Sequence, residues 1–197
     1  MDVIGYALAS NLKIFEGWSS KAAMPTARYA LGTTAVNGKV YAIGGNDGIS
    51  NFTTNEEYDP VTNTWSSKAA MPTARYNLGT TTVNDKVYAI GGHDGFSFFD
   101  TNEEYDPATN TWSSKATMPT ARYSLGITTV NGKVYAIGGR DYTTGRLATN
   151  EEYDPATNTW SSKAAMPTAR YALGTTTVNG KVYAIGGHDD NSYLDTN

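Results

Sequence analysis

Short apolar runs separated by turn residues occupy most of the chain, and the stretch 71–92 shows the pattern most clearly. Within it, Val87 and Ala89 face one way and Tyr88 and Ile90 the other, because successive side chains of a strand point to opposite faces. A short strand that is apolar on both faces is typical of a position between two other layers. We therefore predict a doubly buried strand B at residues 86–90, preceded by strand A at residues 76–83.

Turn residues connect these two strands. The dipeptide Asn-Gly stands at this place in three copies of the pattern, as Asn37-Gly38, Asn131-Gly132 and Asn179-Gly180, and Asn84-Asp85 replaces it in the fourth. Asn-Gly favours the two positive φ angles of a type I′ turn, so strands A and B are predicted to form a tight hairpin. Gly91-Gly92 then ends strand B, at a point where the backbone needs positive φ or where a side chain would clash.

Two further strands are predicted after each hairpin. In the second copy, strand C covers residues 103–105, a turn covers 106–111, and strand D runs through Trp112. Asp, Pro and Asn dominate the intervening segment, as expected for a turn. The neighbouring carboxylates Glu103 and Glu104 point to opposite faces of strand C, so they are not predicted to act as an acid–base pair.

The pattern repeats at residues 24–45, 71–92, 118–139 and 166–187. Its glycine pairs are Gly44-Gly45, Gly91-Gly92, Gly138-Gly139 and Gly186-Gly187, so successive copies lie 47, 47 and 48 residues apart. Tryptophans recur at the same spacing, at Trp18, Trp65, Trp112 and Trp160. Glu-Glu-Tyr-Asp-Pro recurs only three times, starting at Glu56, Glu103 and Glu151. A period near 50 with four short strands per unit is typical of a propeller blade.

These motifs resemble the kelch repeat, in which a di-glycine closes the second strand and a Tyr-Asp-Pro-x-Thr-Asn-x-Trp run follows. The resemblance implies an all-β fold, a β-propeller of four-stranded antiparallel kelch blades, with four blade equivalents per chain. The kelch repeats are assigned to residues 18–197, in units of about 18–64, 65–111, 112–159 and 160–197. The glycine pairs and tryptophans are assigned structural roles, the tryptophans as blade-to-blade packing. Residues 1–17 depart from the repeat and are predicted to supply outer strands for ring closure.

Composition excludes several function classes. The net charge of −4 provides no basic surface for a nucleic acid backbone. No run of eighteen apolar residues is present, so no membrane span is predicted. The chain has no cysteine and two histidines. His93 and His188 fall in alternate repeats, so we predict no metal site, and no cofactor is expected.

The segments between strands B and C differ most between copies. They begin with Asn46, His93, Arg140 and His188. Because loops on a rigid scaffold often carry function, these residues are candidate ligand-binding positions. Drift of unconstrained loops is the alternative explanation.

A second candidate set is the arginine that leads into strand A in every copy, at Arg28, Arg75, Arg122 and Arg170. The resemblance implies a ring of arginines at the mouth of the central channel, and guanidinium groups bind carboxylates in a bidentate manner. The ligand would then be an acidic protein or peptide. Alternatively, each arginine pairs with an aspartate that follows the di-glycine, namely Asp47, Asp94, Asp141 or Asp189.

The function predicted is a non-catalytic scaffold for protein or peptide binding through the face formed by the B–C and D–A loops. One alternative is a kelch-type enzyme acting on a small sugar-like ligand. Near-identical repeats spread every group around the ring, however, whereas an active site needs one asymmetric cluster. Another alternative is a purely structural or engineered repeat array.

The missing fourth Glu-Glu-Tyr-Asp-Pro motif leads to a prediction about assembly, because unpaired strand edges need a cover. A ring of four blades requires an angle of about 90° between neighbouring blades, and a ring of eight requires about 45°. The smaller angle is closer to the angle between blades in the larger propellers. We therefore predict a homodimer of two half-rings that form an eight-bladed ring. A four-bladed ring closed within one chain is the alternative.

Overall fold

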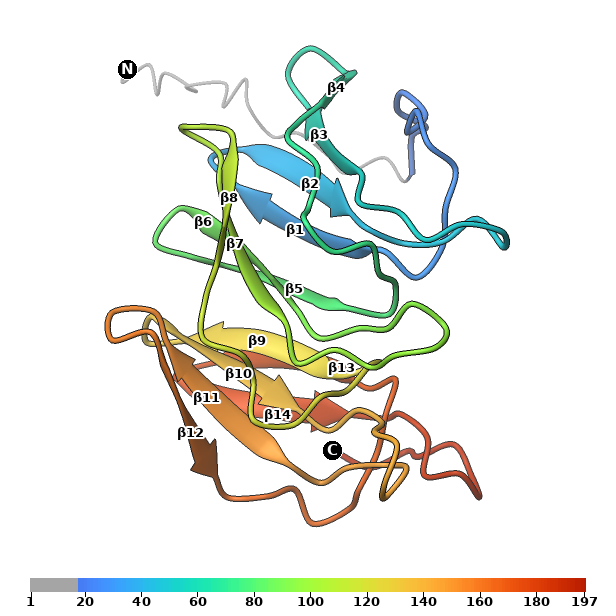
Figure 1. The fold of residues 1–197 in the computed structure, drawn as a ribbon, viewed down its shortest axis with the longest axis vertical. Helices are drawn as coiled ribbons and strands as arrows, with labels where there is room; N and C mark the ends of the chain where they lie inside the picture. Colours follow the sequence, from blue (N-terminus) through green and yellow to red (C-terminus); the bar gives the residue numbers. More distant parts are fainter. Residues whose placement is uncertain (1–17) are drawn as a thin grey trace, which may run out of the picture.

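The computed structural model describes residues 18–197, which form four antiparallel sheets and no helix (Figure 1). The first sheet contains β1 (Gly32–Val36), β2 (Lys39–Ile43), β3 (Asn55–Asp59) and β4 (Thr64–Ser67). The second contains β5 (Gly79–Val83), β6 (Lys86–Ile90), β7 (Asn102–Asp106) and β8 (Thr111–Ser114). The third contains β9 (Gly126–Val130), β10 (Lys133–Ile137), β11 (Asn150–Asp154) and β12 (Thr159–Lys163). The fourth contains β13 (Gly174–Val178) and β14 (Lys181–Ile185). We call these sheets blades 1 to 4.

The predicted all-β blade architecture is confirmed. The A–B turns have the expected backbone, with φ of 49° and 60° at Asn84 and Asp85 and of 51° and 73° at Asn37 and Gly38. Strand A begins later than predicted, at Gly79 instead of residue 76. The reason is Asn77, whose φ of 52° interrupts the extended chain and leaves Tyr76 in an isolated bridge to His93. The role predicted for the N-terminal segment falls on residues 1–17, outside the described residues.

The core lies between the blades. Val36, Tyr41 and Ile43 of blade 1 form a buried cluster with residues of blade 2. The blade 2 members on the facing surface are Val87, Ala89 and Tyr105. An equivalent cluster joins the opposite face of blade 2 to blade 3. Strand β6 is therefore buried on both faces, as its sequence predicted.

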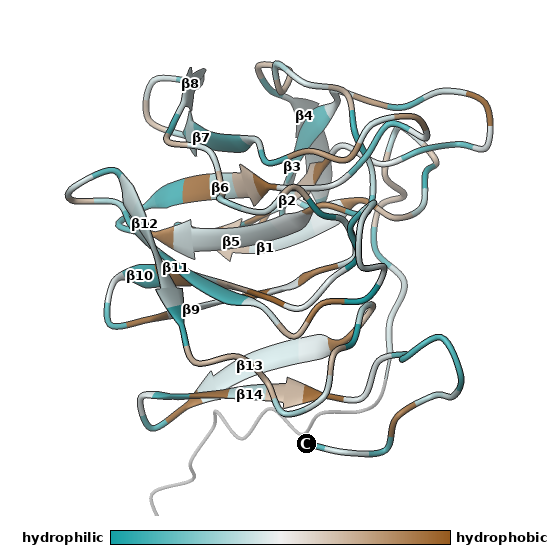
Figure 2. Ribbon diagram, turned by 60° about the horizontal axis from the view of Figure 1, so that its bottom comes forward, coloured by the Kyte–Doolittle hydropathy of each residue, from teal (hydrophilic) through white to brown (hydrophobic). Residues whose placement is uncertain are grey.

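The first strands of the blades pack in sequence, β1 against β5, β5 against β9 and β9 against β13 (Figure 2). Threonine hydroxyls bridge these strands: Thr34 to Thr82 at 3.0 Å, Thr81 to Thr129 at 2.8 Å and Thr128 to Thr177 at 2.9 Å. The blades thus follow one another around a common axis.

Blade 4 differs from its neighbours in exposure. Its Val178 and Ile185 are 49% and 47% exposed, whereas their counterparts in blades 1 to 3 are buried. At the other end of the series, Val40 of blade 1 is exposed, whereas its counterpart Val87 is fully buried. Among the described residues, blade 4 and Val40 of blade 1 therefore expose apolar positions that the inner blades bury.

The di-glycine pairs have both features predicted for them. Gly91 has a φ of 65°, and a Cβ atom built on it would lie 2.6 Å from the carbonyl oxygen of Arg122. Gly92 donates its N–H to the same oxygen at 2.9 Å. The pair is needed because the backbone of the next blade approaches here more closely than any side chain would permit.

Three of the four tryptophans make hydrogen bonds within their own blade. The indole N–H groups of Trp65, Trp112 and Trp160 donate to the carbonyl oxygens of Ala22, Ala69 and Ala116 at 2.8–2.9 Å. These bonds tie strand D to the segment that enters the same blade. For Trp18 the prediction of blade packing is wrong, because its side chain is 99% exposed.

Candidate functional site: the loop face

The segments that follow the second strand of each blade form four loop tips, residues 46–51, 93–98, 140–146 and 188–193. Their first residues, Asn46, His93, Arg140 and His188, lie at the same place in each blade, bridged to Tyr29, Tyr76, Tyr123 and Tyr171 of the D–A loops. We call the end of the molecule formed by the loop tips and these D–A residues the loop face. Figure 1 shows the B–C loops together on one side of the blades.

An aspartate holds each loop tip in the same fold. Asp47 Oδ1 accepts hydrogen bonds from the backbone N–H groups of Ile49 and Ser50 at 2.8 and 2.7 Å. Asp94, Asp141 and Asp189 make the equivalent bonds in the other tips. These N–H groups lower the pKa of Asp47, Asp94 and Asp189, so the carboxylates are ionised at neutral pH. The tips therefore combine variable side chains with a common backbone.

Aromatic rings fill the space between the tips of blades 2 and 3. The His93 ring lies 3.9 Å from Tyr76 and 4.3 Å from Tyr123, centroid to centroid. Phe98 stacks on Tyr142 at 3.8 Å. Burial lowers the pKa of His93, and the nearby charge of Asp94 opposes this shift, so the ring is neutral at pH 7. Nε2 of His93 lies 3.1 Å from Asn77 Nδ2. The loop face is thus an ordered aromatic surface here.

Charged groups dominate between the tips of blades 3 and 4. Arg140 lies over the Tyr171 ring at 5.1 Å, a cation–π geometry. Arg140 and Arg146 both pair with Asp190, at 3.5 and 3.1 Å. The two arginines that belong to the loop tips are thereby partly neutralised.

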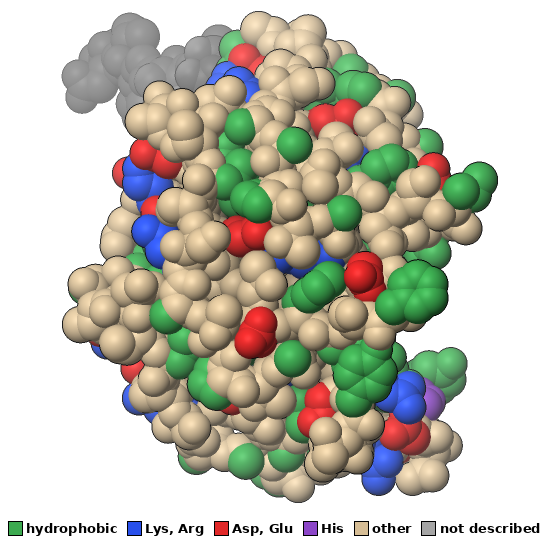
Figure 3. All heavy atoms as spheres, in the orientation of Figure 1, with side chains coloured by type: hydrophobic (Ala, Val, Ile, Leu, Met, Phe, Trp, Pro, Cys, Tyr) green, Lys and Arg blue, Asp and Glu red, His purple; other side chains and the backbone are tan. Residues whose placement is uncertain are grey.

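The outermost side chains of the loop tips are apolar. Ile49, Phe96, Tyr142 and Tyr193 are 93%, 88%, 66% and 89% exposed. In Figure 3 hydrophobic side chains project along the right edge, where Figure 1 places the B–C loops. Each loop tip thus exposes one large apolar or aromatic side chain to solvent.

The recurring arginines do not lie on this surface. Arg28, Arg75 and Arg122 have fully buried side chains and pair with Glu56, Glu103 and Glu151 at 2.7, 3.0 and 2.6 Å. The alternative pairing with Asp47, Asp94 and Asp141 is not found either, because those aspartates bind their own loops. Burial lowers the pKa of Arg75 to about 10, with the charge of Glu103 opposing the shift, so the guanidinium is charged at neutral pH. An arginine ring open to acidic ligands is not present in blades 1 to 3.

Leucines surround the centre of the loop face instead. A shallow pocket of about 290 Å³ is lined by one leucine and its preceding residue from every blade. The leucines are Leu31, Leu78, Leu125 and Leu173. Backbone bonds connect the blades here, from Asn77 N–H to Ala30 O, Ser124 N–H to Asn77 O and Ala172 N–H to Ser124 O. The channel mouth thus combines leucine side chains with polar groups and backbone bonds between blades.

The sequence matches two kelch family models. The KLHDC2/KLHL20/DRC7 Kelch-repeats domain matches residues 5–139, and the Kelch motif matches residues 121–167 and 169–197. The chain belongs to the kelch-repeat family.

A solved structure, "Structure of YjhT", shares the kelch fold of this chain with a TM-score of 0.78 and 20% sequence identity. The alignment covers 87% of this chain and 63% of that chain, so the present sequence spans less than two thirds of that protein. At this identity the likeness concerns the fold alone. No curated protein matches the sequence.

Among residues 18–197, no three His, Asp or Glu side chains gather in a geometry suited to a metal ion. The same residues contain no helix that is long and apolar enough to cross a membrane.

Sequence reasoning about the kelch repeat missed the glutamate partner of the buried arginine. The first Glu of Glu-Glu-Tyr-Asp-Pro lies 28 or 29 residues after its arginine. The shared period of the glutamate and the arginine is the sequence signal that could have identified this pair. The second glutamate faces the other way, toward the hydroxyl of Tyr41, Tyr88 or Tyr135.

Proposed function

We propose that this kelch chain is a non-catalytic scaffold that binds a protein or peptide partner through the loop face. The observation that carries the proposal is the set of four exposed apolar side chains on rigid loop tips. Their backbone is fixed by the aspartate bonds, so binding would cost little ordering entropy. The blades supply the framework, and the variable tips supply the specificity.

The charges of the loop tips favour a partner that offers apolar and basic groups. The tips contain five aspartates, Asp47, Asp94, Asp141, Asp189 and Asp190, against two arginines, Arg140 and Arg146. The buried arginines of blades 1 to 3 contribute no exposed positive charge. An acidic ligand, expected from the sequence, would therefore meet repulsion at most of this face.

Replacement of the apolar tips tests the proposal. The triple variant Ile49→Ser/Phe96→Ser/Tyr142→Ser should capture at least about tenfold less partner than the parent protein. Serine at each position cannot bury the apolar surface that the parent side chain would bury on binding. Capture from the source lysate, quantified by mass spectrometry, measures the loss. Val61→Ser is the matched control, because Val61 is 89% exposed in the turn between β3 and β4, at the opposite end of the strands. Equal capture by all three proteins would contradict the proposal.

We also propose that two copies associate through the uncovered faces of blades 1 and 4. Blade 1 presents Val40, the counterpart of Val87, which blade 2 buries against blade 1. Blade 4 presents Val178 and Ile185, the counterparts of residues that blades 1 to 3 bury. Each copy thus offers both halves of an interface already formed within the chain, and two-fold closure yields the eight-bladed ring.

Gly174 provides a specific test of this association. At the equivalent glycines 32, 79 and 126, a Cβ atom would lie 2.2–2.9 Å from a side chain of the next blade, whereas at Gly174 the nearest atom is 3.8 Å away. Gly174→Ala should therefore keep the fold of the chain, as judged by circular dichroism, but prevent association. Light scattering should give about 42 kDa for the parent, twice 21.1 kDa, and about 21 kDa for the variant. A parent that stays at 21 kDa would contradict the proposal.

A further inference from the structure

A tyrosine directly follows the recurring arginine of every blade, at Tyr29, Tyr76, Tyr123 and Tyr171. Each tyrosine forms an isolated bridge with the first residue of the loop tip in its own blade, which is Asn46, His93, Arg140 or His188. The tyrosine is therefore constant around the loop face, whereas the residue bridged to it changes from blade to blade. We call the space between the tyrosines of two consecutive blades a tyrosine slot.

Planar side chains that carry nitrogen fill two of these slots. Between blades 2 and 3, the His93 ring lies 3.9 Å from Tyr76 and 4.3 Å from Tyr123, centroid to centroid. Between blades 3 and 4, the guanidinium of Arg140 lies over the Tyr171 ring, 5.1 Å from its centroid. The fold thus positions an imidazole or a guanidinium against the tyrosine of the following blade.

The slot between blades 1 and 2 holds no such group among the described residues. Its variable residue is Asn46, whose side chain turns back to its own loop. There Nδ2 donates to Asn51 Oδ1 at 2.7 Å, and Oδ1 accepts from the N–H of Gly48. Tyr29 and Tyr76 meet directly instead, edge to face, with ring centroids 6.4 Å apart. Blades 1 and 2 are both complete sheets of four strands, so this slot has both of its walls.

The surroundings of this slot are negatively charged. The loop tips of blades 1 and 2, residues 46–51 and 93–98, contain Asp47 and Asp94 and no lysine or arginine. Each carboxylate accepts the N–H groups of its loop through Oδ1. Burial raises the pKa of Tyr76, and two neighbouring tyrosine hydroxyls and the charge of Asp94 add to the shift. The negative charge of Asp94 therefore acts on a wall of the slot.

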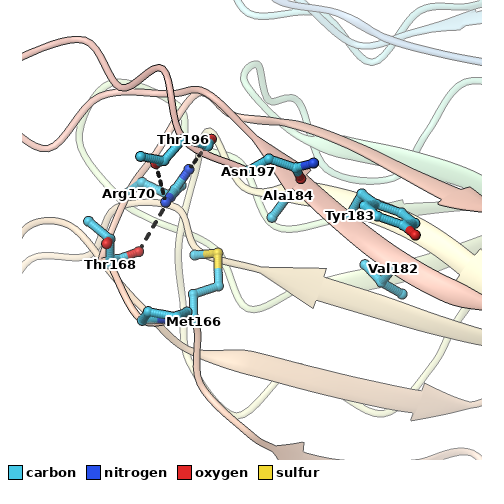
Figure 4. Close-up of a pocket in the computed structure, with 9 residues that line it drawn as sticks. Met166, Thr168, Arg170, Val182, Tyr183, Ala184, Thr196 and Asn197 are labelled. Atoms are coloured by element: carbon cyan, nitrogen blue, oxygen red, sulfur yellow. Dashed lines mark hydrogen bonds between the residues drawn. The ribbon is translucent and has the colours of Figure 1, made fainter.

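The recurring arginines add no accessible positive charge here. Arg28 and Arg75, which precede the two tyrosines of the slot, have fully buried side chains and form ion pairs with glutamates of the third strands. Arg170 has the same inward direction in blade 4, where its guanidinium donates to the carbonyl oxygen and the hydroxyl of Thr196 at 3.1 and 2.9 Å (Figure 4). Aromatic faces beside uncompensated aspartates favour a cationic group from another molecule.

We propose that the tyrosine slot between blades 1 and 2 binds the guanidinium of an arginine in the partner protein. The guanidinium stacks on Tyr29 and Tyr76, in the way that Arg140 lies over the tyrosine of blade 4. Asp94 balances its charge, as Asp190 does for Arg140 at 3.5 Å. Tyr29, which is exposed, turns aside to admit the group, since interface side chains commonly change rotamer on binding.

Arginine fits this slot better than lysine, because its head group is planar, weakly hydrated and able to stack on an aromatic ring. The exposed apolar side chains of Ile49 and Phe96, in the loop tips of blades 1 and 2, favour apolar residues beside the arginine. The inference rests on the function proposed for the loop face, and it names the chemistry of the partner at that face.

A short peptide with one arginine between apolar residues, acetyl-Leu-Gly-Arg-Gly-Leu-amide, tests the slot directly. A counterpart with citrulline in place of arginine has the same shape and no charge. In NMR spectra of the 197-residue chain, the ring signals of Tyr29 and Tyr76 should shift saturably with the arginine peptide. The citrulline peptide should bind at least about tenfold more weakly. Shifts that do not saturate at millimolar peptide, or equal affinity for both peptides, would overturn the proposal.

Replacement of Asn46 by arginine tests the slot from the protein side. Asn46→Arg places a guanidinium of the chain itself where Arg140 stands in blade 3, so affinity for the arginine peptide should fall at least about tenfold. Val61→Arg is the matched control, because it adds the same charge in the turn between β3 and β4 and should leave the affinity unchanged. Unchanged binding in Asn46→Arg, or an equal loss in Val61→Arg, would overturn the proposal.

Asp94→Asn gives a readout that a change in loop shape would not give. Asparagine keeps the Oδ1 acceptor that holds the loop tip but removes the charge. This variant should therefore weaken binding of the arginine peptide and leave binding of the citrulline peptide unchanged. It also decides the outcome if circular dichroism shows that Asn46→Arg does not fold. Equal effects on the two peptides would count against the slot.

Partner capture separates this inference from the proposed function. If Asn46→Arg captures as much partner as the parent, while Ile49→Ser/Phe96→Ser/Tyr142→Ser captures less, the loop face binds its partner without the slot and the inference is wrong. If the triple variant captures as much as the parent, the proposed function fails. The peptide titration then decides by itself whether the slot binds arginine.

Discussion

Glu103→Ala is expected to lower the free energy of unfolding by about 3–5 kcal/mol, because it leaves a fully buried guanidinium without its counter-charge. Arg75 Nη2 lies 3.0 Å from Glu103 Oε2, and both side chains are essentially inaccessible to water. The guanidinium would keep its hydrogen bond to the carbonyl oxygen of Ala89 but would have no anion nearby. Urea unfolding followed by tryptophan fluorescence measures the change.

Two matched variants make this result specific to the buried pair. Lys86→Ala breaks the exposed pair Lys86–Asp106, formed at 2.6 Å, and should cost no more than about 1 kcal/mol. The double replacement Arg75→Met/Glu103→Leu should recover most of the lost stability, since an apolar pair can replace a buried ion pair. If Glu103→Ala costs no more than Lys86→Ala, the ion pair does not stabilise the blade as the structure indicates.

Ile90→Ala is expected to cost about 2–5 kcal/mol, through lost burial and the cavity that it leaves. Ile90 is fully buried in the cluster between blades 2 and 3. Ile185→Ala is the matched control, because the same residue of the identical sequence Lys-Val-Tyr-Ala-Ile is 47% exposed in blade 4. It should cost less than about half as much. Equal losses in urea unfolding at low protein concentration would contradict the difference between the two blades.

The strands and turns of the repeat could be predicted from local sequence because their signals are local. Asn-Gly turns, di-glycines with positive φ and alternating apolar residues act within a few positions. Burial could not be predicted in this way. Residues 86–90 and 181–185 have the same sequence, yet β6 is buried and β14 is largely accessible, because burial depends on the neighbouring blade.

The role of the arginines illustrates a second limit. The aspartate after the di-glycine and the glutamate of strand C both recur with the arginine, so periodicity could not select between them. The structure selects the glutamate because strand pairing places Glu103 opposite Ala89, whose carbonyl oxygen also accepts from Arg75. The ring of accessible arginines was accordingly a wrong expectation, and alanine at these positions should reduce stability.

Amide hydrogen exchange of the chain with and without its captured partner tests the proposed role of the loop face most directly. We expect added protection at residues 46–51, 93–98, 140–146 and 188–193, and little change in the turns at the opposite end of the blades. Protection confined to those opposite turns, with the four loop tips unchanged, would contradict it.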